Sequence, residues 1–349
     1  YAEHLNDELA GKPLDRQLLD RFAEAVRGTG LAADMGCGPG HVGRYLHDRG
    51  VEICGIDLSP GLLEQARRLH PGLKFQQGDL CALAQPDGAF AGIVAFYSMV
   101  HLAPAELPRA LRELTDASRA LLDGGDAVGA ARLLNDQAAV YVRLGDPVRA
   151  SHLLEESRRV FERLAPADAS AALEMAETDH LLARLPLHVA ARPGREADAI
   201  TMGREYAAAA ERAYRELGAT RELTRVWETI GRIEMKARRI EPALHSLNAA
   251  LEAQRELGDV LGLARTTAAL AELLAQVGQT ENALQLLGES ILLNVEKGSP
   301  IGLAYNRRSL EGLGRTVTPP LTPLYQDIHR KLTSAEASLG RITLPGERD

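Results

Sequence analysis

The stretch ADMGCGPGHVGRYL, residues 33–46, decides how the first part of the chain folds. Three glycines, Gly36, Gly38 and Gly40, occupy every second position just after an acidic residue, Asp34. Glycine adopts positive φ at little cost and lets a ligand approach the backbone closely. A helical pattern follows the turn, and the free N–H groups and positive dipole end of that helix point back at it. The stretch therefore predicts a binding turn for an anionic group, such as a pyrophosphate or a carboxylate.

Short apolar segments alternate with helical patterns around this turn. Such alternation predicts a parallel, doubly wound α/β sheet, in which ligands sit at the carboxyl ends of the strands. Ser59 is expected to cap the helix that begins near Pro60. The expected strands cover 31–35, 51–57, 73–79 and 90–98, and the expected helices cover 15–27, 41–50, 60–70 and 104–114.

Acidic residues close the next two expected strands. Asp57 ends the second strand within GIDLSP, and Asp79 ends the third within GDL. A carboxylate after the second strand can accept two hydrogen bonds from ribose hydroxyls. Residues 38–43 also satisfy the GxGxxG of dinucleotide binders, so a dehydrogenase is one alternative. The position of Asp34 fits that alternative poorly, and no catalytic set follows the glycines.

The longer pattern Asp34-Met35-Gly36-Cys37-Gly38-Pro39-Gly40 resembles the DxGxGxG signature of class I S-adenosylmethionine-dependent methyltransferases. The resemblance runs from Tyr1 to about Leu114 and includes AFYSMVHL at 95–102, similar to the family's fourth strand and the loop after it. It implies S-adenosylmethionine as cofactor and Tyr97 and His101 as catalytic candidates beside the reacting methyl group. A loop histidine with no role in catalysis is the alternative for His101. The implied cofactor-binding residues are Asp34, Gly36, Gly38, Gly40, Asp57, Leu58, Asp79 and Leu80.

The family pattern stops after ALREL at 110–114, where the sequence turns helical. The fifth, sixth and seventh strands of the family are absent from the pattern, so the fourth strand is expected to be an edge with unpaired backbone groups. A helix starting near 116 or a second copy of the chain could cover it. Oligomerisation through this open edge therefore follows as a prediction.

The second half of the chain repeats itself every 40 residues. The segment beginning at Leu217 recurs at Leu257 and at Lys297. With Trp227 and small residues at matching positions, the unit resembles tetratricopeptide (TPR) repeats, which stack helix pairs into a superhelix with a concave face. The resemblance implies a protein or peptide partner on that face. Arg225, Arg265 and Tyr305 share one register there, and a solvated helix face is the alternative. Ala243, Ala250, Ala283 and Gly231 are expected where helices cross closely.

The expected fold is a Rossmann-like α/β domain with a truncated class I methyltransferase sheet, followed by an all-α TPR-like solenoid. Its boundaries are predicted at 1–115, 116–340 with a capping helix, and 341–349 as a frayed tail. The predicted function is methyl transfer to a small-molecule or protein acceptor, with the repeats binding a partner. The alternative is a TPR scaffold or regulator whose cofactor domain is catalytically impaired. A junction of two unrelated genes near 115 is a third interpretation.

Composition excludes several classes of partner. The net charge of −8, without a basic excess in either half, argues against nucleic acid. The sequence contains no run of about 18 apolar residues, so no membrane span is expected. Cys37, Cys54 and Cys81 form no CxxC pair, which argues against a zinc site and favours buried thiols in a reducing cytoplasm. We therefore expect a cytoplasmic protein with no metal.

Overall fold

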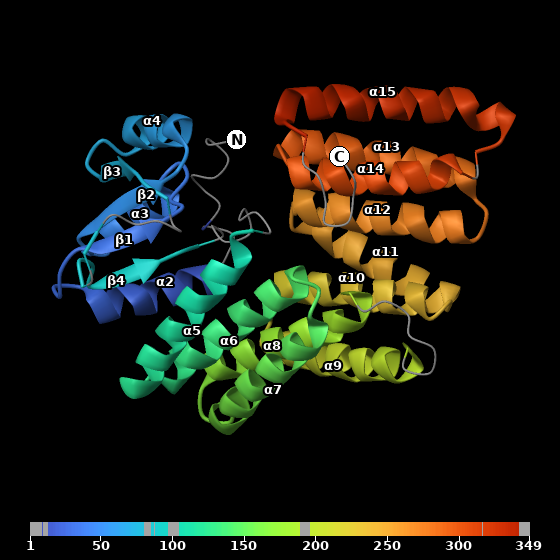
Figure 1. Ribbon diagram of the computed structural model, residues 1–349. Coiled ribbons are helices and arrows are strands. Elements are labelled where there is room, and N and C mark those ends of the chain that lie inside the picture. Colours follow the sequence, from blue (N-terminus) through green and yellow to red (C-terminus); the bar gives the residue numbers. More distant parts are fainter. Residues whose placement is uncertain are drawn as a thin grey trace. The chain divides into compact units, whose positions relative to one another are not determined.

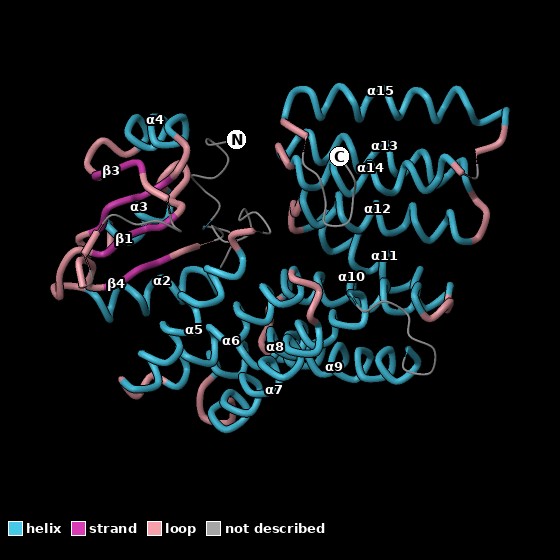
Figure 2. The backbone as a smooth tube through the Cα atoms, viewed as in Figure 1, coloured by secondary structure: helices cyan, strands magenta, loops and turns pink. Residues whose placement is uncertain are grey.

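The chain divides into two compact units, residues 1–113 and 114–349. Within the described residues, strands occur in the first unit and the second is built from helices (Figure 2). The structure is a computed structural model that describes residues 9, 13–79, 85–86, 88–96, 105–188, 196–315 and 317–341.

The first unit contains a four-stranded parallel sheet with the strand order β3-β2-β1-β4 (Figure 1). In the centre, Ala32 of β1 pairs with Ile53 of β2 and with Gly92 of β4. No strand lies beyond β4 among the described residues, so β4 is an edge of the sheet there. The elements are α2 (Pro13–Val26), β1 (Ala32–Met35), α3 (His41–His47), β2 (Ile53–Asp57), α4 (Pro60–Leu69), β3 (Lys74–Gln77) and β4 (Gly92–Val94).

The order and type of these elements agree with the sequence pattern. Ser59 caps α4 as expected, because its Oγ accepts a hydrogen bond from the Leu62 N–H at 3.4 Å. The fourth strand is shorter than expected, covering Gly92–Val94 within the expected 90–98, of which 97 and 98 lie outside the described residues. The helix expected to end at 114 is longer than expected, because α5 (Leu107–Asp123) continues past that point.

One face of the sheet packs against helices. Ala32 and Ile53 share a buried apolar cluster with Ala23 of α2 and Leu46 of α3. Gly92 allows α2 to lie close, since a Cβ atom on it would fall 2.6 Å from Val26 Cγ1. The opposite face carries a second buried cluster, made of Ala33, Met35, Cys54 and Ile56.

The second unit is an array of helices in which the predicted 40-residue period is visible. Helices α10, α12 and α14 start at Thr220, Val260 and Pro300, and α11 and α13 start at Ile240 and Thr280. The bounds are α6 (Ala127–Arg143), α7 (Pro147–Leu164), α8 (Ala169–His188), α9 (Glu196–Glu216), α10 (Thr220–Lys236), α11 (Ile240–Glu256), α12 (Val260–Gln276), α13 (Thr280–Lys297), α14 (Pro300–Gly314), a 3-10 turn η3 (Pro319–Leu321) and α15 (Thr322–Leu339).

Small residues let the helix pairs of the array approach one another, as predicted. A Cβ atom on Gly231 of α10 would lie 2.6 Å from Leu247 Cγ of α11, so a larger residue would push these helices apart. Ala243, Ala250 and Ala283 are fully buried. Pro186 lies buried inside the last turn of α8.

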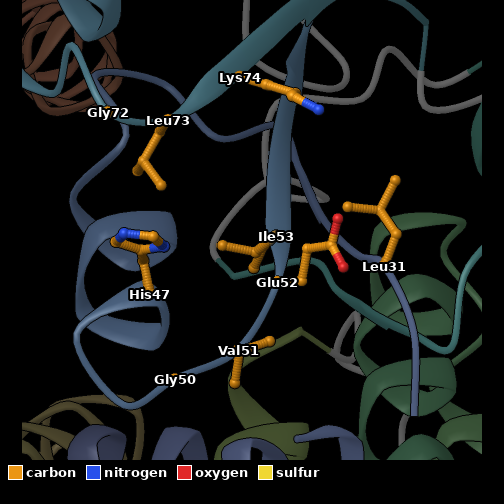
Figure 3. Close-up of a pocket in the computed structure, with 9 residues that line it drawn as sticks. All are labelled: Leu31, His47, Gly50, Val51, Glu52, Ile53, Gly72, Leu73 and Lys74. Carbon is orange, nitrogen blue, oxygen red and sulfur yellow. The ribbon is translucent and has the colours of Figure 1, made fainter. Parts of the chain in front are cut away.

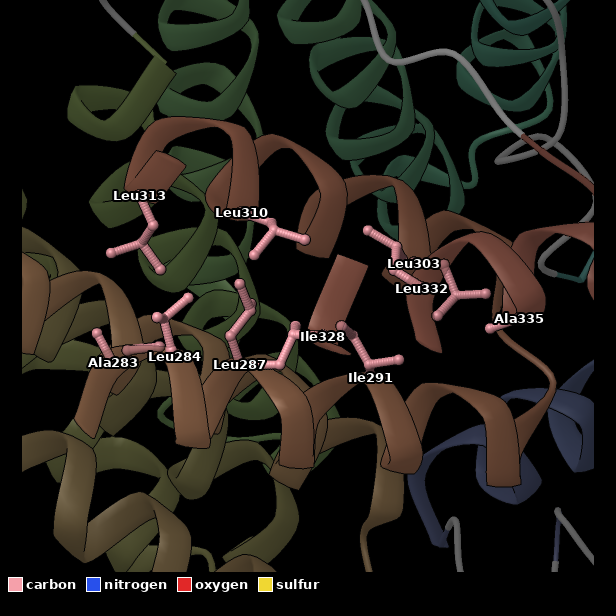
Figure 4. Close-up of a cluster of buried hydrophobic side chains, with 11 residues drawn as sticks. Ala283, Leu284, Leu287, Ile291, Leu303, Leu310, Leu313, Ile328, Leu332 and Ala335 are labelled. Carbon is pink, nitrogen blue, oxygen red and sulfur yellow. The ribbon is translucent and has the colours of Figure 1, made fainter. Parts of the chain in front are cut away.

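The last helices close the array around one apolar cluster (Figure 4). Leu287 of α13, Leu310 of α14 and Ile328 of α15 meet there, and none is more than 2% exposed. Burying each such side chain contributes about 1.5–3 kcal/mol relative to leaving it in water. The expected capping helix is therefore α15, which covers the apolar sides of α13 and α14.

Candidate functional site

The glycine turn joins the carboxyl end of β1 to α3 and holds three left-handed residues. The φ angles of Gly36, Gly38 and Gly40 are 68°, 53° and 87°, which disfavours side chains at all three positions. The N–H groups of Gly36 and Cys37 both donate to the carbonyl of Ile56 in β2, at 2.7 and 3.1 Å. The turn is thus anchored to the neighbouring strand as well as to its own.

Asp34 lies buried beneath the glycine turn and is not part of its exposed surface. Its side chain is 1% exposed, and Oδ2 accepts a hydrogen bond from the Gly43 N–H in α3 at 2.9 Å. Burial raises the pKa of this carboxyl to about 7, against the lowering effect of the Gly43 N–H bond and with a further raising effect from the charge of Asp57. The carboxyl fixes the first turn of α3 relative to β1.

Asp57 connects the glycine turn to the turn that follows β2. Its Oδ2 accepts from the Gly38 N–H and its Oδ1 accepts from the Ser59 N–H, both at 2.8 Å. Each carboxylate oxygen can accept one more hydrogen bond, so the pair remains able to receive two ribose hydroxyls. The neighbouring Leu58 is 64% exposed, which leaves an apolar side chain open beside that carboxylate.

The third strand contributes residues that the sequence analysis missed. Phe75 of β3 lies against two glycines: a Cβ atom on Gly40 would be 2.8 Å from its Cζ, and one on Gly55 would be 2.5 Å from its Cδ1. His70 is also buried beside Gly40, and its Nε2 has no hydrogen-bond partner. Phe75 could have been found from the pairing of β2 with β3, which sets it directly beside Gly55.

The remaining predicted site residues divide into two groups. Asp79 directly follows Gly78, whose N–H donates to the Asp57 carbonyl at 3.1 Å, so the end of β3 lies beside the end of β2. Leu80, Tyr97 and His101 lie outside the described residues, as does Cys81. The geometry therefore brings together Asp34, Gly36, Gly38, Gly40, Asp57, Leu58 and Asp79 at one end of the sheet.

A cavity of about 340 Å³ opens at the opposite end of the same sheet (Figure 3). Its walls come from the residues that precede or begin β1, β2 and β3, among them Leu31, Val51 and Leu73, with Glu52 and Lys74 at its sides. None of the glycine-turn residues lines it. The cavity is therefore separate from the predicted cofactor site.

In the array, two arginines of the predicted register form ion pairs, one joining α10 to α8 and one joining α12 to α10. Arg225 Nη2 lies 3.5 Å from Glu177 Oε1, and Arg265 Nε lies 3.2 Å from Glu228 Oε2. Tyr305, the third member, is 55% exposed. Trp227 packs against a buried apolar cluster and donates from Nε1 to Glu211 at 2.8 Å.

Two kinds of site are not found in the described part of the chain. No group of three or more His, Cys, Asp or Glu residues is placed to hold a metal ion there. Among the helices that the structure describes, none has the length and apolar character needed to traverse a bilayer.

Comparison with known proteins identifies the first part of the chain. Residues 32–125 match a family described as "Methyltransferase domain". Over 86 residues the chain is 42% identical to a trans-aconitate 2-methyltransferase of Methylobacterium nodulans, covering 23% of this chain and 33% of that protein. It is also 35% identical, over 86 residues, to a malonyl-[acyl-carrier protein] O-methyltransferase of Serratia marcescens, and this match covers 25% of this chain and 33% of that protein. The chain thus spans about a third of the length of these curated relatives.

The helical part resembles a solved structure only distantly. That structure is a STAND signal-transduction ATPase with a tetratricopeptide repeat sensor from Pyrococcus horikoshii, with a TM-score of 0.44 and 15% identity, covering 68% of this chain and 37% of that one. A similarity of this size assigns no function. The matches of the first part are specific, and residues 32–125 accordingly carry a methyltransferase domain, whose family implies S-adenosylmethionine as the cofactor.

Proposed function

We propose that the first unit binds S-adenosylmethionine at the glycine turn and transfers its methyl group to a small-molecule or protein acceptor. The observation that carries the proposal is Asp57, whose two carboxylate oxygens hold the glycine turn and the turn after β2 together. These bonds hold Asp57 and the exposed side chain of Leu58 beside the glycine turn, which supports a ribose-binding role for Asp57. The chemistry of the set fits the cofactor, because buried or partly buried carboxylates favour a cationic sulfonium.

The residues of this chain take distinct roles in the proposal. The backbone of Gly36, Gly38 and Gly40 accommodates the methionine part, since none of these three residues carries a side chain. A Cβ atom on Gly38 would meet nothing within 4 Å, so that side of the turn is open. Asp57 accepts the ribose hydroxyls, and Leu58 covers one side of the adenine. We assign Asp79 and Leu80 to the adenine as well.

When bound, the cofactor supplies an electrophilic methyl group for direct displacement by a nucleophile. The protein then contributes mainly by position, since holding two reactants in line lowers the barrier without a covalent intermediate on the enzyme. We keep His101 as the proposed base that receives the acceptor's proton and Tyr97 as a neighbour of the methyl group. An imidazole suits proton transfer near neutral pH. Two relatives are named for acceptors that carry free carboxyl groups, so trans-aconitate is the first acceptor to test.

Calorimetry with S-adenosylmethionine and S-adenosylhomocysteine tests the cofactor claim directly. Leu58→Ala is the sharpest variant, because an exposed leucine adds little to the fold yet should weaken binding severalfold if it covers the adenine. Leu292→Ala is the matched control, a leucine of α13 that is 59% exposed. The absence of heat with either ligand at millimolar concentration would remove the cofactor role.

The second candidate function gives the array the leading role, with a catalytically impaired cofactor domain. It is favoured by the edge position of β4, beyond which no strand lies among the described residues. Methyl transfer measured with labelled cofactor and the full chain separates the two candidates. We also infer a cytoplasmic location, because Cys37 and Cys54 are free, buried thiols.

A further inference from the structure

Strand β3 lies at the edge of the sheet opposite β4. Among the described strands it pairs only with β2, and three of its four residues are exposed. A strand with so little buried surface contributes little to the core of the sheet. Two of its side chains, Phe75 and Gln77, nevertheless contact the two turns that form the proposed cofactor site.

The ring of Phe75 fills the space between the start of α3 and strand β2. A Cβ atom on Gly40 would lie 2.8 Å from the ring Cζ, and one on Gly55 would lie 2.5 Å from Cδ1. The Cys37 Sγ atom lies 2.8 Å from the same Cβ position on Gly55, so the thiol and the ring share this space. Arg67 Nη2 donates to the Phe75 carbonyl at 3.0 Å, which fixes β3 to α4.

Phe75 thus contacts both segments that the Asp57 carboxylate joins. Gly55 comes two residues before Asp57, on the same face of β2, and Gly40 comes two residues after Gly38. Asp57 Oδ2 accepts from the Gly38 N–H at 2.8 Å. A smaller side chain at 75 would leave a void into which the glycine turn could settle, and this would displace the hydrogen bond. The ring therefore sets the distance between the glycine turn and β2.

Gln77 supports the turn that follows β2. Its Nε2 donates to the Leu58 carbonyl at 3.2 Å. The N–H of the next residue, Gly78, donates to the Asp57 carbonyl at 3.1 Å. Two successive carbonyls of this turn therefore accept hydrogen bonds from the end of β3. Because Gln77 is exposed, its bond adds little to the stability of the fold but fixes the backbone that carries Leu58.

We propose that β3 is the positioning strand of the cofactor site. Phe75 holds the glycine turn that would take the methionine part, and Gln77 holds the turn whose Asp57 and Leu58 would take the nucleoside part. The inference rests on the proposed binding of S-adenosylmethionine. Both side chains act through the backbone of these turns and need no contact with the ligand.

Calorimetry on the full chain tests Gln77 with S-adenosylhomocysteine and with 5′-methylthioadenosine, which lacks the amino-acid part. Gln77→Ala should weaken both about threefold to tenfold, as for the loss of one neutral hydrogen bond. Gln76→Ala is the matched control, because Gln76 is an exposed glutamine on the opposite face of β3. It makes no side-chain hydrogen bond with the residues that the structure describes. Neither variant should change the thermal midpoint, so a loss of affinity reports the position of the turn.

The same measurement tests Phe75. Phe75→Leu should weaken S-adenosylhomocysteine about tenfold and 5′-methylthioadenosine less, because the second ligand lacks the part that the glycine turn would hold. Phe22→Leu is the control, since the Phe22 ring packs on Gly92 of the same sheet, with Cζ 3.0 Å from the Cβ position of that glycine. Both variants should lower the thermal midpoint, but only Phe75→Leu should speed hydrogen exchange of the peptide 36–43 in the free chain.

Equal affinities within either pair of variant and control overturn the inference, as does equal exchange of the peptide 36–43 in Phe75→Leu and Phe22→Leu. If Phe75→Leu does not fold, the comparison of Gln77→Ala with Gln76→Ala decides. An unmodified chain that binds neither ligand removes the proposed function and this inference with it. Binding by the unmodified chain, with no difference between variants and controls, removes the inference alone.

Discussion

Replacing Asp34 by asparagine should stabilise the first unit at neutral and alkaline pH, although Asp34 lies at the centre of the proposed site. The asparagine carbonyl can still accept the hydrogen bond from the Gly43 N–H, so the contact to α3 survives. What disappears is a charge in a fully buried position next to Asp57. Burial is the main reason that the pKa of the Asp34 carboxyl rises from 3.8 to about 7.

The sign of the effect follows from proton binding. Between pH 3.8 and about 7 the folded chain holds a proton on Asp34 that the unfolded chain has released. The stability that this proton contributes to the folded state is therefore fully present below pH 3.8 and is lost as the pH rises through 7. At 1.36 kcal/mol per pKa unit, the loss reaches about 4 kcal/mol by pH 8. Asparagine suffers no such loss, so the advantage of the variant should be small near pH 4 and largest at pH 8.

Hydrogen exchange of the β1 and β2 peptides in the full chain measures this difference locally. At pH 8 the Asp34→Asn chain should exchange up to about a thousandfold more slowly than the unmodified chain at the same pH. Trp227, the single tryptophan, reports on the array, and its fluorescence transition should not move. Asp48→Asn, an exposed carboxylate paired with Arg44, is the control. Faster exchange of the Asp34 variant at pH 8, or an equal effect at pH 4 and 8, would refute the reasoning.

Three further changes test the packing of each unit by thermal or denaturant unfolding. Gly92→Val should destabilise the sheet by about 1–3 kcal/mol, because its Cβ would overlap Val26, and a neutral result would contradict the packing of α2 on β4. Gln254→Met should stabilise the array by about 1–3 kcal/mol, because both polar atoms of Gln254 are buried without partners; a loss would point to a bound water. Glu228→Gln should lower the thermal midpoint by several degrees, because it removes the buried carboxylate that pairs with Arg265 and Arg232. Raising the salt concentration should not restore the midpoint.

Much of the fold could be predicted because its signals are local. The glycines of the turn, the cap at Ser59 and the 40-residue period each depend on residues close in sequence. The burial of Ala243 and the close approach at Gly231 followed from the repeat alone. Local signals of this kind are consistent with one another in chains that fold to one structure.

What sequence reasoning missed depends on contacts between segments distant in the chain. The packing of Phe75 on the glycine turn requires the register of β2 with β3. Helix α5 continues through the point near 115 where the sequence pattern changes, because the residues on both sides of that point favour a helix. Pro186 fits inside α8 near its end, where helix propensity alone predicts a break. The role of Asp57 in holding Gly38 likewise needs the fold, because nineteen residues separate them.

Charge that the fold leaves uncompensated distinguishes Asp34 from Glu228 in this chain. Asp34 is buried beside a second carboxylate, so its negative charge opposes folding in the absence of a ligand. Neutralising Asp34 should preserve or raise stability while weakening a ligand of opposite charge, which is the sulfonium in the proposed function. Glu228 is compensated twice, so its removal should lower stability. A residue that serves only the fold cannot produce opposite changes in stability and binding, because losing its contacts lowers both.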